Sequence, residues 1–148
     1  MKKIITSLLF IMTTFLFAGC SDSTSNESIG IKDTNGDYSK LNIALISDTI
    51  GTEQFILQAY EALEKASNTY GFKMTSIECT DTAAWEENTL AASNEGYDLI
   101  IGIGWQAADP FSDAADKFPN TKYAVIDTTA ANQKVTSFGF NEAQGSYV

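Results

Sequence analysis

Two alternating hydrophobic patterns constrain the fold of this chain more than any other feature. Short apolar runs recur from Leu41 onward, and most are followed by a segment whose apolar residues lie three or four positions apart. The runs are typical of strands, and the wider spacing is typical of amphipathic helices. Strands that alternate with helices predict a parallel sheet covered by helices on both faces.

The boundaries of the predicted elements follow from these patterns. Thr52 is the expected N-cap of the first helix, and Gly71 and Gly96 are expected to end the first two helices. The first strand reads as central and the second as an edge, so we expect a three-layer α/β fold with the five-stranded order 2-1-3-4-5. The predicted strands are 41–47, 72–79, 97–104, 122–127 and 135–140, and the predicted helices are 52–70, 82–95 and 107–118, with another starting at Asn141.

The first forty residues do not fit this pattern. Two lysines precede a mostly apolar run over 4–17, which is short for a membrane span and typical of a secretory signal. The next residues, Phe17-Ala18-Gly19-Cys20, resemble the lipobox of bacterial lipoproteins, in which Cys20 would be diacylated. We therefore predict a lipoprotein signal peptide over 1–20 and a flexible polar tether over 21–40. The alternative is an ordinary signal peptide with a chance cysteine.

Composition excludes several classes of function. The chain has nineteen acidic residues against nine lysines, with no arginine or histidine, and its formal net charge is −10. Such a chain is a poor candidate for nucleic-acid binding. Without histidine, the commonest general base and metal ligand are missing, so we expect neither a metal nor a cofactor. With Cys20 lipidated, Cys79 has no partner for an intrachain disulfide and is expected to be a small buried residue.

Five candidate ligand-binding residues lie near the predicted carboxyl ends of strands, where open parallel sheets bind ligands. Trp105 ends the apolar run "LIIGIGW", and its ring could stack on a flat ligand that the glycines of that run allow to approach. Each candidate also has a purely structural alternative, such as packing for the aromatic residues and capping for the acids. The candidates are Asp48, Phe55, Trp105, Asp109 and Asp127.

Two rival interpretations depend on the same region. The segment 102–107 matches G-x-G-x-x-A and is followed by Asp127 about twenty residues later, as in a dinucleotide-binding fingerprint. We disfavour that function because the motif falls in the third strand–helix unit and Trp105 would crowd the phosphates. A hydrolase is also disfavoured, because no nucleophile has a visible base partner.

Three segments resemble the basic membrane protein family of solute-binding lipoproteins. They are "FILQAYEAL" over 55–63, "GYDLIIGIGWQAADPFSDAADKFPNTKYAVID" over 96–127 and "VTSFGFNEAQGSYV" over 135–148. The resemblance implies a type I periplasmic-binding-protein fold, with two lobes that close on a ligand and feed it to an ABC permease. Residues 41–148 would then be most of the N-terminal lobe, and we expect the chain to be a fragment or a truncated product of something longer. The alternative is a short natural C-terminal helix.

The resemblance also carries roles for individual residues. Phe55 matches an aromatic residue that stacks on a base, Trp105 stands where the family often has phenylalanine, and Asp109 and Asp127 match acids. The chain departs from the family at Ile56, where an asparagine is usual. The resemblance implies a monomeric, lipid-anchored protein on the extracytoplasmic face of the membrane that binds a nucleoside or a similar solute. A regulatory or sensory ectodomain of the same fold, or an exported enzyme, is the alternative.

Overall fold

The computed structural model describes residues 36–141. Eight principal elements follow one another along this part of the chain. They are β1 (Asn42–Asp48), α1 (Gln54–Tyr70), β2 (Lys73–Cys79), α2 (Thr82–Glu95), β3 (Leu99–Ile103), α3 (Ala108–Lys117), β4 (Lys122–Ile126) and β5 (Val135–Phe138). Two short 3₁₀ helices, η1 (Tyr38–Lys40) and η2 (Trp105–Ala107), precede β1 and α3. No helix within 36–141 is long and apolar enough to cross a membrane.

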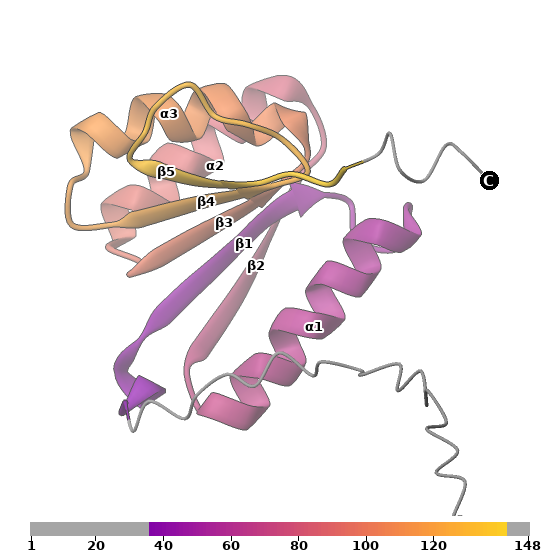
Figure 1. Ribbon diagram of the computed structural model, residues 1–148, viewed down its shortest axis with the longest axis vertical. Helices are drawn as coiled ribbons and strands as arrows, with labels where there is room; N and C mark the ends of the chain where they lie inside the picture. The colour runs from indigo at the N-terminus through magenta and orange to yellow at the C-terminus, as the bar shows by residue number, and fades with distance from the viewer. Residues whose placement is uncertain (1–35, 142–148) are drawn as a thin grey trace, which may run out of the picture. The chain divides into compact units, whose positions relative to one another are not determined.

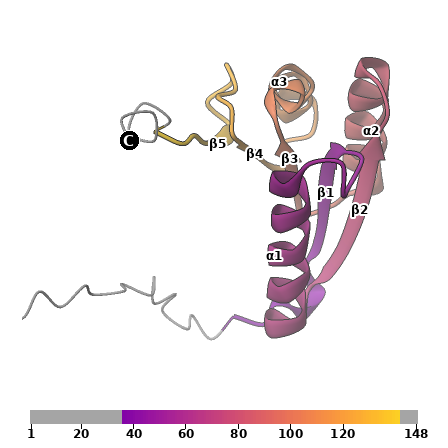
Figure 2. The ribbon, with the colours of Figure 1, turned by 90° about the vertical axis from the view of Figure 1, so that its right-hand side faces the viewer.

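The five strands form one parallel sheet in the order β2-β1-β3-β4-β5. Figure 2 shows the strands side by side in this order. The predicted topology is therefore confirmed, including the central position of β1 and the edge position of β2. Because all five strands run the same way, their carboxyl ends meet along one edge of the sheet, which we call the rim.

Helices cover both faces of the sheet. Figure 1 shows α2 and α3 on one side and α1 on the other. The larger core lies beneath α2 and α3, where Trp85, Phe111 and Tyr123 are almost fully buried. The smaller core lies beneath α1 and is built around Leu45, Ile56 and Ile103. Full burial of a large apolar side chain contributes about 1.5–3 kcal/mol, so these two cores account for much of the stability.

Gly102 allows α3 to pack closely on β3. A Cβ atom at this position would lie 2.4 Å from the Cβ of Ala107 and 2.8 Å from the ring of Phe111. No side chain fits into such a space. The sequence suggested that Gly102 lets the backbone approach a ligand, but the glycine is buried, and a helix occupies the space beside it.

The helix boundaries confirm some predictions and correct others. Helices α1 and α2 end at Gly71 and Gly96, as expected. The prediction for the start of α1 was wrong, because the N-cap is Glu53 and its side chain makes no capping hydrogen bond. Thr52 instead donates its hydroxyl to the carbonyl of Thr49 at 2.7 Å, within the turn that precedes α1. The predicted signal peptide, most of the tether, and residues 142–148 of the predicted last helix lie outside the described residues.

Candidate functional site

Two hollows open at the rim and share one wall. The larger has a volume of about 380 Å³ and lies toward β2, between the turn after β1 and the start of α2. We call it the β2-side hollow. The smaller, of about 160 Å³, lies toward β4, and we call it the β4-side hollow. Both are lined by Asp48, Trp105 and Gln106. The β4-side hollow is completed by Glu53, Phe55, Ile56, Ile103, Gly104 and Asp127.

Asp48, the last residue of β1, is part of the shared wall. Its Oδ1 accepts a hydrogen bond from Nε1 of Trp85 at 3.2 Å, and its Oδ2 accepts one from Nε2 of Gln106 at 2.9 Å. Trp85 is 1% exposed, so one end of this chain of bonds is anchored in the core. The carboxylate is therefore fixed between α2 and η2. Each carboxylate oxygen has two lone pairs, so Asp48 retains capacity to accept a further bond.

Trp105 begins η2 directly after Gly104. Gly104 has a φ of 96°, a conformation that residues with a side chain rarely adopt. This turn directs the indole of Trp105 away from the core, and 73% of the side chain is exposed. Tryptophan is usually much more buried than this. The alternative that Trp105 seals the core is therefore wrong, and its ring is accessible to a ligand.

Phe55 lies on the first turn of α1 and lines the β4-side hollow. The side chain is half-buried and packs on the core beneath α1. The ring also makes an edge-to-face contact with Phe140, with centroids 5.8 Å apart and an interplanar angle of 84°. Phe140 is 60% exposed. Phe55 thus packs α1 on the sheet and also forms part of the rim.

Asp127 follows directly after β4 and has a φ of 64°, the only positive value at a residue other than glycine within 36–141. Its backbone N–H donates to the carbonyl of Phe138 at 2.8 Å, which fixes the residue against β5. Left-handed backbone at such a residue costs of order 1 kcal/mol or more and is concentrated at functional sites. Asp127 lines the β4-side hollow.

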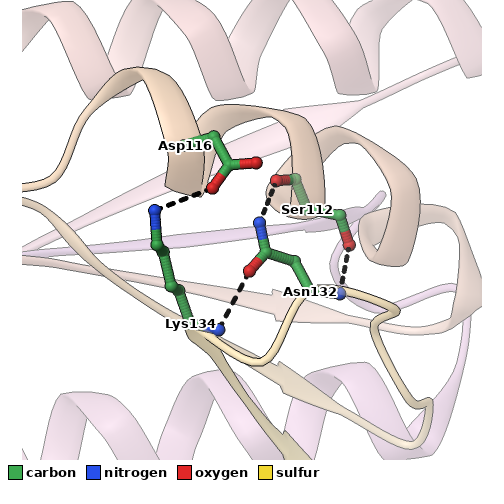
Figure 3. A network of polar contacts seen from close by, with 4 residues as sticks. All are labelled: Ser112, Asp116, Asn132 and Lys134. Atoms are coloured by element: carbon green, nitrogen blue, oxygen red, sulfur yellow. Dashed lines mark hydrogen bonds and ion pairs between the residues drawn. The ribbon is translucent and has the colours of Figure 1, made fainter.

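The connection from β4 to β5 is tied to α3 by polar contacts, shown in Figure 3. Nδ2 of Asn132 donates to the carbonyl of Ser112 at 2.8 Å, and the backbone N–H of Lys134 donates to Oδ1 of Asn132 at 3.0 Å. Nζ of Lys134 lies 2.8 Å from Oδ1 of Asp116, and hydrogen bonding from this ammonium holds the pKa of the Asp116 carboxyl below its usual value. These contacts order the loop that begins at Asp127.

Comparison with known proteins now identifies the family. The model of the Bmp family, described as PnrA-like ABC transporter substrate-binding proteins, matches residues 40–148. The chain belongs to this family. It is 26% identical over 157 residues to the ABC transporter nucleoside-binding protein BmpA of Lactococcus lactis subsp. cremoris, covering 100% of this chain and 43% of BmpA. It is 30% identical over 128 residues to an uncharacterized lipoprotein of Pyrococcus abyssi, covering 83% of this chain and 30% of the relative.

A solved structure supports the same assignment. An ABC transporter solute-binding protein from Aeropyrum pernix K1 matches with a TM-score of 0.63 and 27% identity, over 69% of this chain and 29% of that chain. The Bmp chain therefore has the fold of a solute-binding protein. It spans less than half the length of these relatives.

Four of the five predicted site residues of the Bmp chain lie together. Asp48, Phe55, Trp105 and Asp127 all line the β4-side hollow. Asp109 does not join them. It lies in the first turn of α3 and lines a separate depression of about 130 Å³, together with Leu90 of α2 and other residues of the two helices.

Sequence reasoning did not select Gln106, although it lines both hollows. The available signal was its position directly after Trp105, at the same strand end as a predicted site residue. Cys79 is 2% exposed, and burial raises the pKa of its thiol, in agreement with the expectation of an unreactive buried cysteine. Within 36–141, no cluster of three or more acidic or cysteine side chains could hold a metal ion.

Proposed function

We propose that the Bmp chain contributes a ligand-binding lobe to an extracytoplasmic lipoprotein that delivers a nucleoside, or a similar ring-containing solute, to an ABC permease. The observation that carries this proposal is the β4-side hollow, where an exposed tryptophan and a phenylalanine lie beside carboxylates at the rim. The membership in a family of ABC transporter substrate-binding proteins and the nucleoside-binding relative BmpA support the same function.

The chemistry of the β4-side hollow suits a sugar joined to a flat ring. Stacking of a base on an aromatic side chain contributes about 1–3 kcal/mol, and Trp105 and Phe55 provide two such rings. Asp48 and Asp127 provide carboxylate oxygens that accept hydrogen bonds from hydroxyl or amine groups. Charge-assisted bonds of this kind are roughly twice as strong as neutral ones.

We further propose that the protein binds its ligand without converting it. The polar side chains of the β4-side hollow are three carboxylates and one amide, Asp48, Glu53, Asp127 and Gln106. Capture and release of a solute require only such groups, with hydrogen bonds that form and break reversibly. Incubation of each ligand with the protein, followed by chromatography, should return the ligand unchanged; conversion that one carboxylate substitution abolishes would favour an exported enzyme.

A titration tests the binding function directly. Adenosine, guanosine, inosine, cytidine, uridine and ribose are each titrated to millimolar concentration into ¹⁵N-labelled protein, so that NMR detects even a weak complex. We expect nucleosides to change the chemical shifts of residues at the rim. We also expect Trp105→Ala to raise the dissociation constant by about 5- to 150-fold, the equivalent of 1–3 kcal/mol. Phe138→Ala is the matched control, because Phe138 is also an exposed aromatic, at 54%, but lines neither hollow.

The titration has two outcomes that would contradict the proposal. No shift at the rim with any of the six compounds would exclude nucleosides and ribose as ligands. Equal affinities in Trp105→Ala and in the control would exclude the stacking arrangement.

The lipid anchor has its own test. Cys20 of the lipobox lies outside the described residues, and the proposal is supported by the sequence around it and by the lipoprotein relative. Cys20→Ser should move the protein from the membrane fraction to the soluble fraction and abolish incorporation of radiolabelled palmitate. Equal membrane association and labelling in the Cys20→Ser protein would contradict the anchor.

A further inference from the structure

The side-chain amide of Gln106 is held in one orientation. Nε2 donates to Oδ2 of Asp48 at 2.9 Å. A carboxylate can only accept hydrogen bonds, so the amide group that faces Asp48 must be the NH₂ and not the carbonyl. Asp48 is itself held by the buried indole of Trp85. The orientation of the amide is thus determined by a chain of bonds that begins in the core.

The other end of the amide, Oε1, lies over Gly104. A Cβ atom at Gly104 would be only 2.8 Å from Oε1 of Gln106, so the oxygen lies in the space that a side chain would take. Gly104 and Gln106 both line the β4-side hollow. No residue within 36–141 donates a hydrogen bond to this oxygen. The carbonyl is therefore available to accept a bond from outside the chain.

The neighbours of this carbonyl define what it can recognise. The other polar side chains of the β4-side hollow are Asp48, Glu53 and Asp127, which as carboxylates also only accept hydrogen bonds. Phe55 and Trp105 line the same hollow, so a base that stacks on either ring lies beside these acceptors. A base edge that carries an N–H donor satisfies the acceptors, whereas an edge without one leaves them unpaired.

We propose that Gln106 is a specificity-determining residue whose side-chain carbonyl, oriented by Asp48, accepts a hydrogen bond from the exocyclic amino group of a bound nucleobase. This inference rests on the proposed nucleoside-binding function and extends it to one class of base. In this arrangement Asp48 acts partly as a positioning residue, because it keeps the amide from turning its NH₂ toward the ligand.

The test compares two nucleosides that differ by one donor group. Adenosine carries a 6-amino group, and purine riboside has a hydrogen in its place. We expect the wild-type protein to bind adenosine about fivefold more tightly, as one neutral hydrogen bond provides. In Gln106→Met, which lacks the carbonyl, the ratio of the two affinities should fall to about one. In Asp48→Asn, in which the amide of Gln106 is free to turn, the ratio should also decrease.

Asp113→Asn is the charge-matched control. Asp113 is an exposed aspartate that lines neither hollow, so this variant should keep the fivefold preference. Substitution of a residue with only a structural role would weaken the binding of both nucleosides alike and leave the ratio of their affinities unchanged. Gln106→Met keeps the test decisive if Asp48→Asn does not fold, because Gln106 is only half-buried.

Each outcome gives a separate conclusion. Loss of the preference in Gln106→Met, with the preference retained in the control, supports the role of Gln106. Binding of both nucleosides with a ratio near one in the wild type, or with the same ratio in wild type and Gln106→Met, overturns this inference and leaves the proposed function intact. Failure of the wild-type protein to bind any nucleoside overturns the proposed function and this inference with it.

Discussion

Replacing Gly102 by alanine tests whether the close contact between α3 and β3 holds the rim together. The added Cβ would lie 2.4 Å from the Cβ of Ala107 and 2.8 Å from the ring of Phe111, closer than real side-chain atoms approach. Either α3 moves away from β3 or the strand shifts. Overpacking of this kind costs about 1–3 kcal/mol, and the contact with Ala107 puts Gly102→Ala at the upper end.

Such a loss is large enough to measure by thermal unfolding followed by circular dichroism. For a domain of roughly 100 residues, about 3 kcal/mol corresponds to a fall in Tm of roughly 10 °C or more. Gly139→Ala is the matched control, because a Cβ at Gly139 meets nothing within 4 Å and the residue has no positive φ. We expect that control to change the free energy of unfolding by less than about 0.5 kcal/mol.

A second substitution locates the clash. Ala107→Gly removes the nearest atom, so the double variant Gly102→Ala/Ala107→Gly should be more stable than the sum of the two single changes predicts. The coupling should be about 0.5–3 kcal/mol, as for residues in direct contact. The reasoning is refuted if Gly102→Ala unfolds at the same temperature as Gly139→Ala, or if the coupling is zero.

Three further predictions follow from other parts of the structure. Gly104→Ala should lower the free energy of unfolding by about 1–2 kcal/mol in urea titrations, because the residue has a φ of 96°. The added Cβ would also meet Oε1 of Gln106 and should displace the amide of that side chain. An unchanged urea midpoint and an unchanged side-chain amide resonance of Gln106 would contradict this prediction. The pKa of Asp116 is lowered by Lys134 from an ordinary value of 3.8, so its contribution to stability is present above that pH and is lost as the pH falls through the folded-state pKa. Acid unfolding of Asp116→Asn should therefore show a shallower pH dependence below about 4, and a profile identical to the wild type would refute this. Cys79 should react with a thiol reagent in the native state at less than about 1% of its rate in urea, because the thiol is buried and its pKa is raised. Similar reaction rates in the two conditions would contradict this prediction and show that β2 opens readily.

The topology of the sheet could be predicted from the sequence because it depends on local patterns. The apolar runs at β1 and β3 indicated strands buried on both faces, and the half-polar pattern at β2 indicated an edge strand. The rule that parallel strands bind ligands at their carboxyl ends then placed Asp48, Trp105 and Asp127 on one rim. None of these steps required knowledge of a contact between distant residues.

The details of the site depend on contacts that no local pattern encodes. Asp48 is bonded to Trp85 and Gln106, which are 37 and 58 positions away in the sequence. The direction in which the side chain of Asp109 points depends on where α3 begins. This helix begins at Ala108, directly after a 3₁₀ turn. The sequence suggested where polar groups gather, but not which of them are already bonded to one another.

The bond between the buried indole of Trp85 and Asp48 has an optical consequence. The chain contains only two tryptophans, so Trp105→Phe leaves Trp85 as the sole indole fluorophore. Its N–H donates to a carboxylate of the shared wall, while its ring lies in the core. A solute in the β4-side hollow that donates a hydrogen bond to Asp48 should alter the emission of Trp85 without touching the ring, because Trp85 does not line that hollow. The protein thus has an intrinsic probe that reports occupancy of the rim from inside the fold.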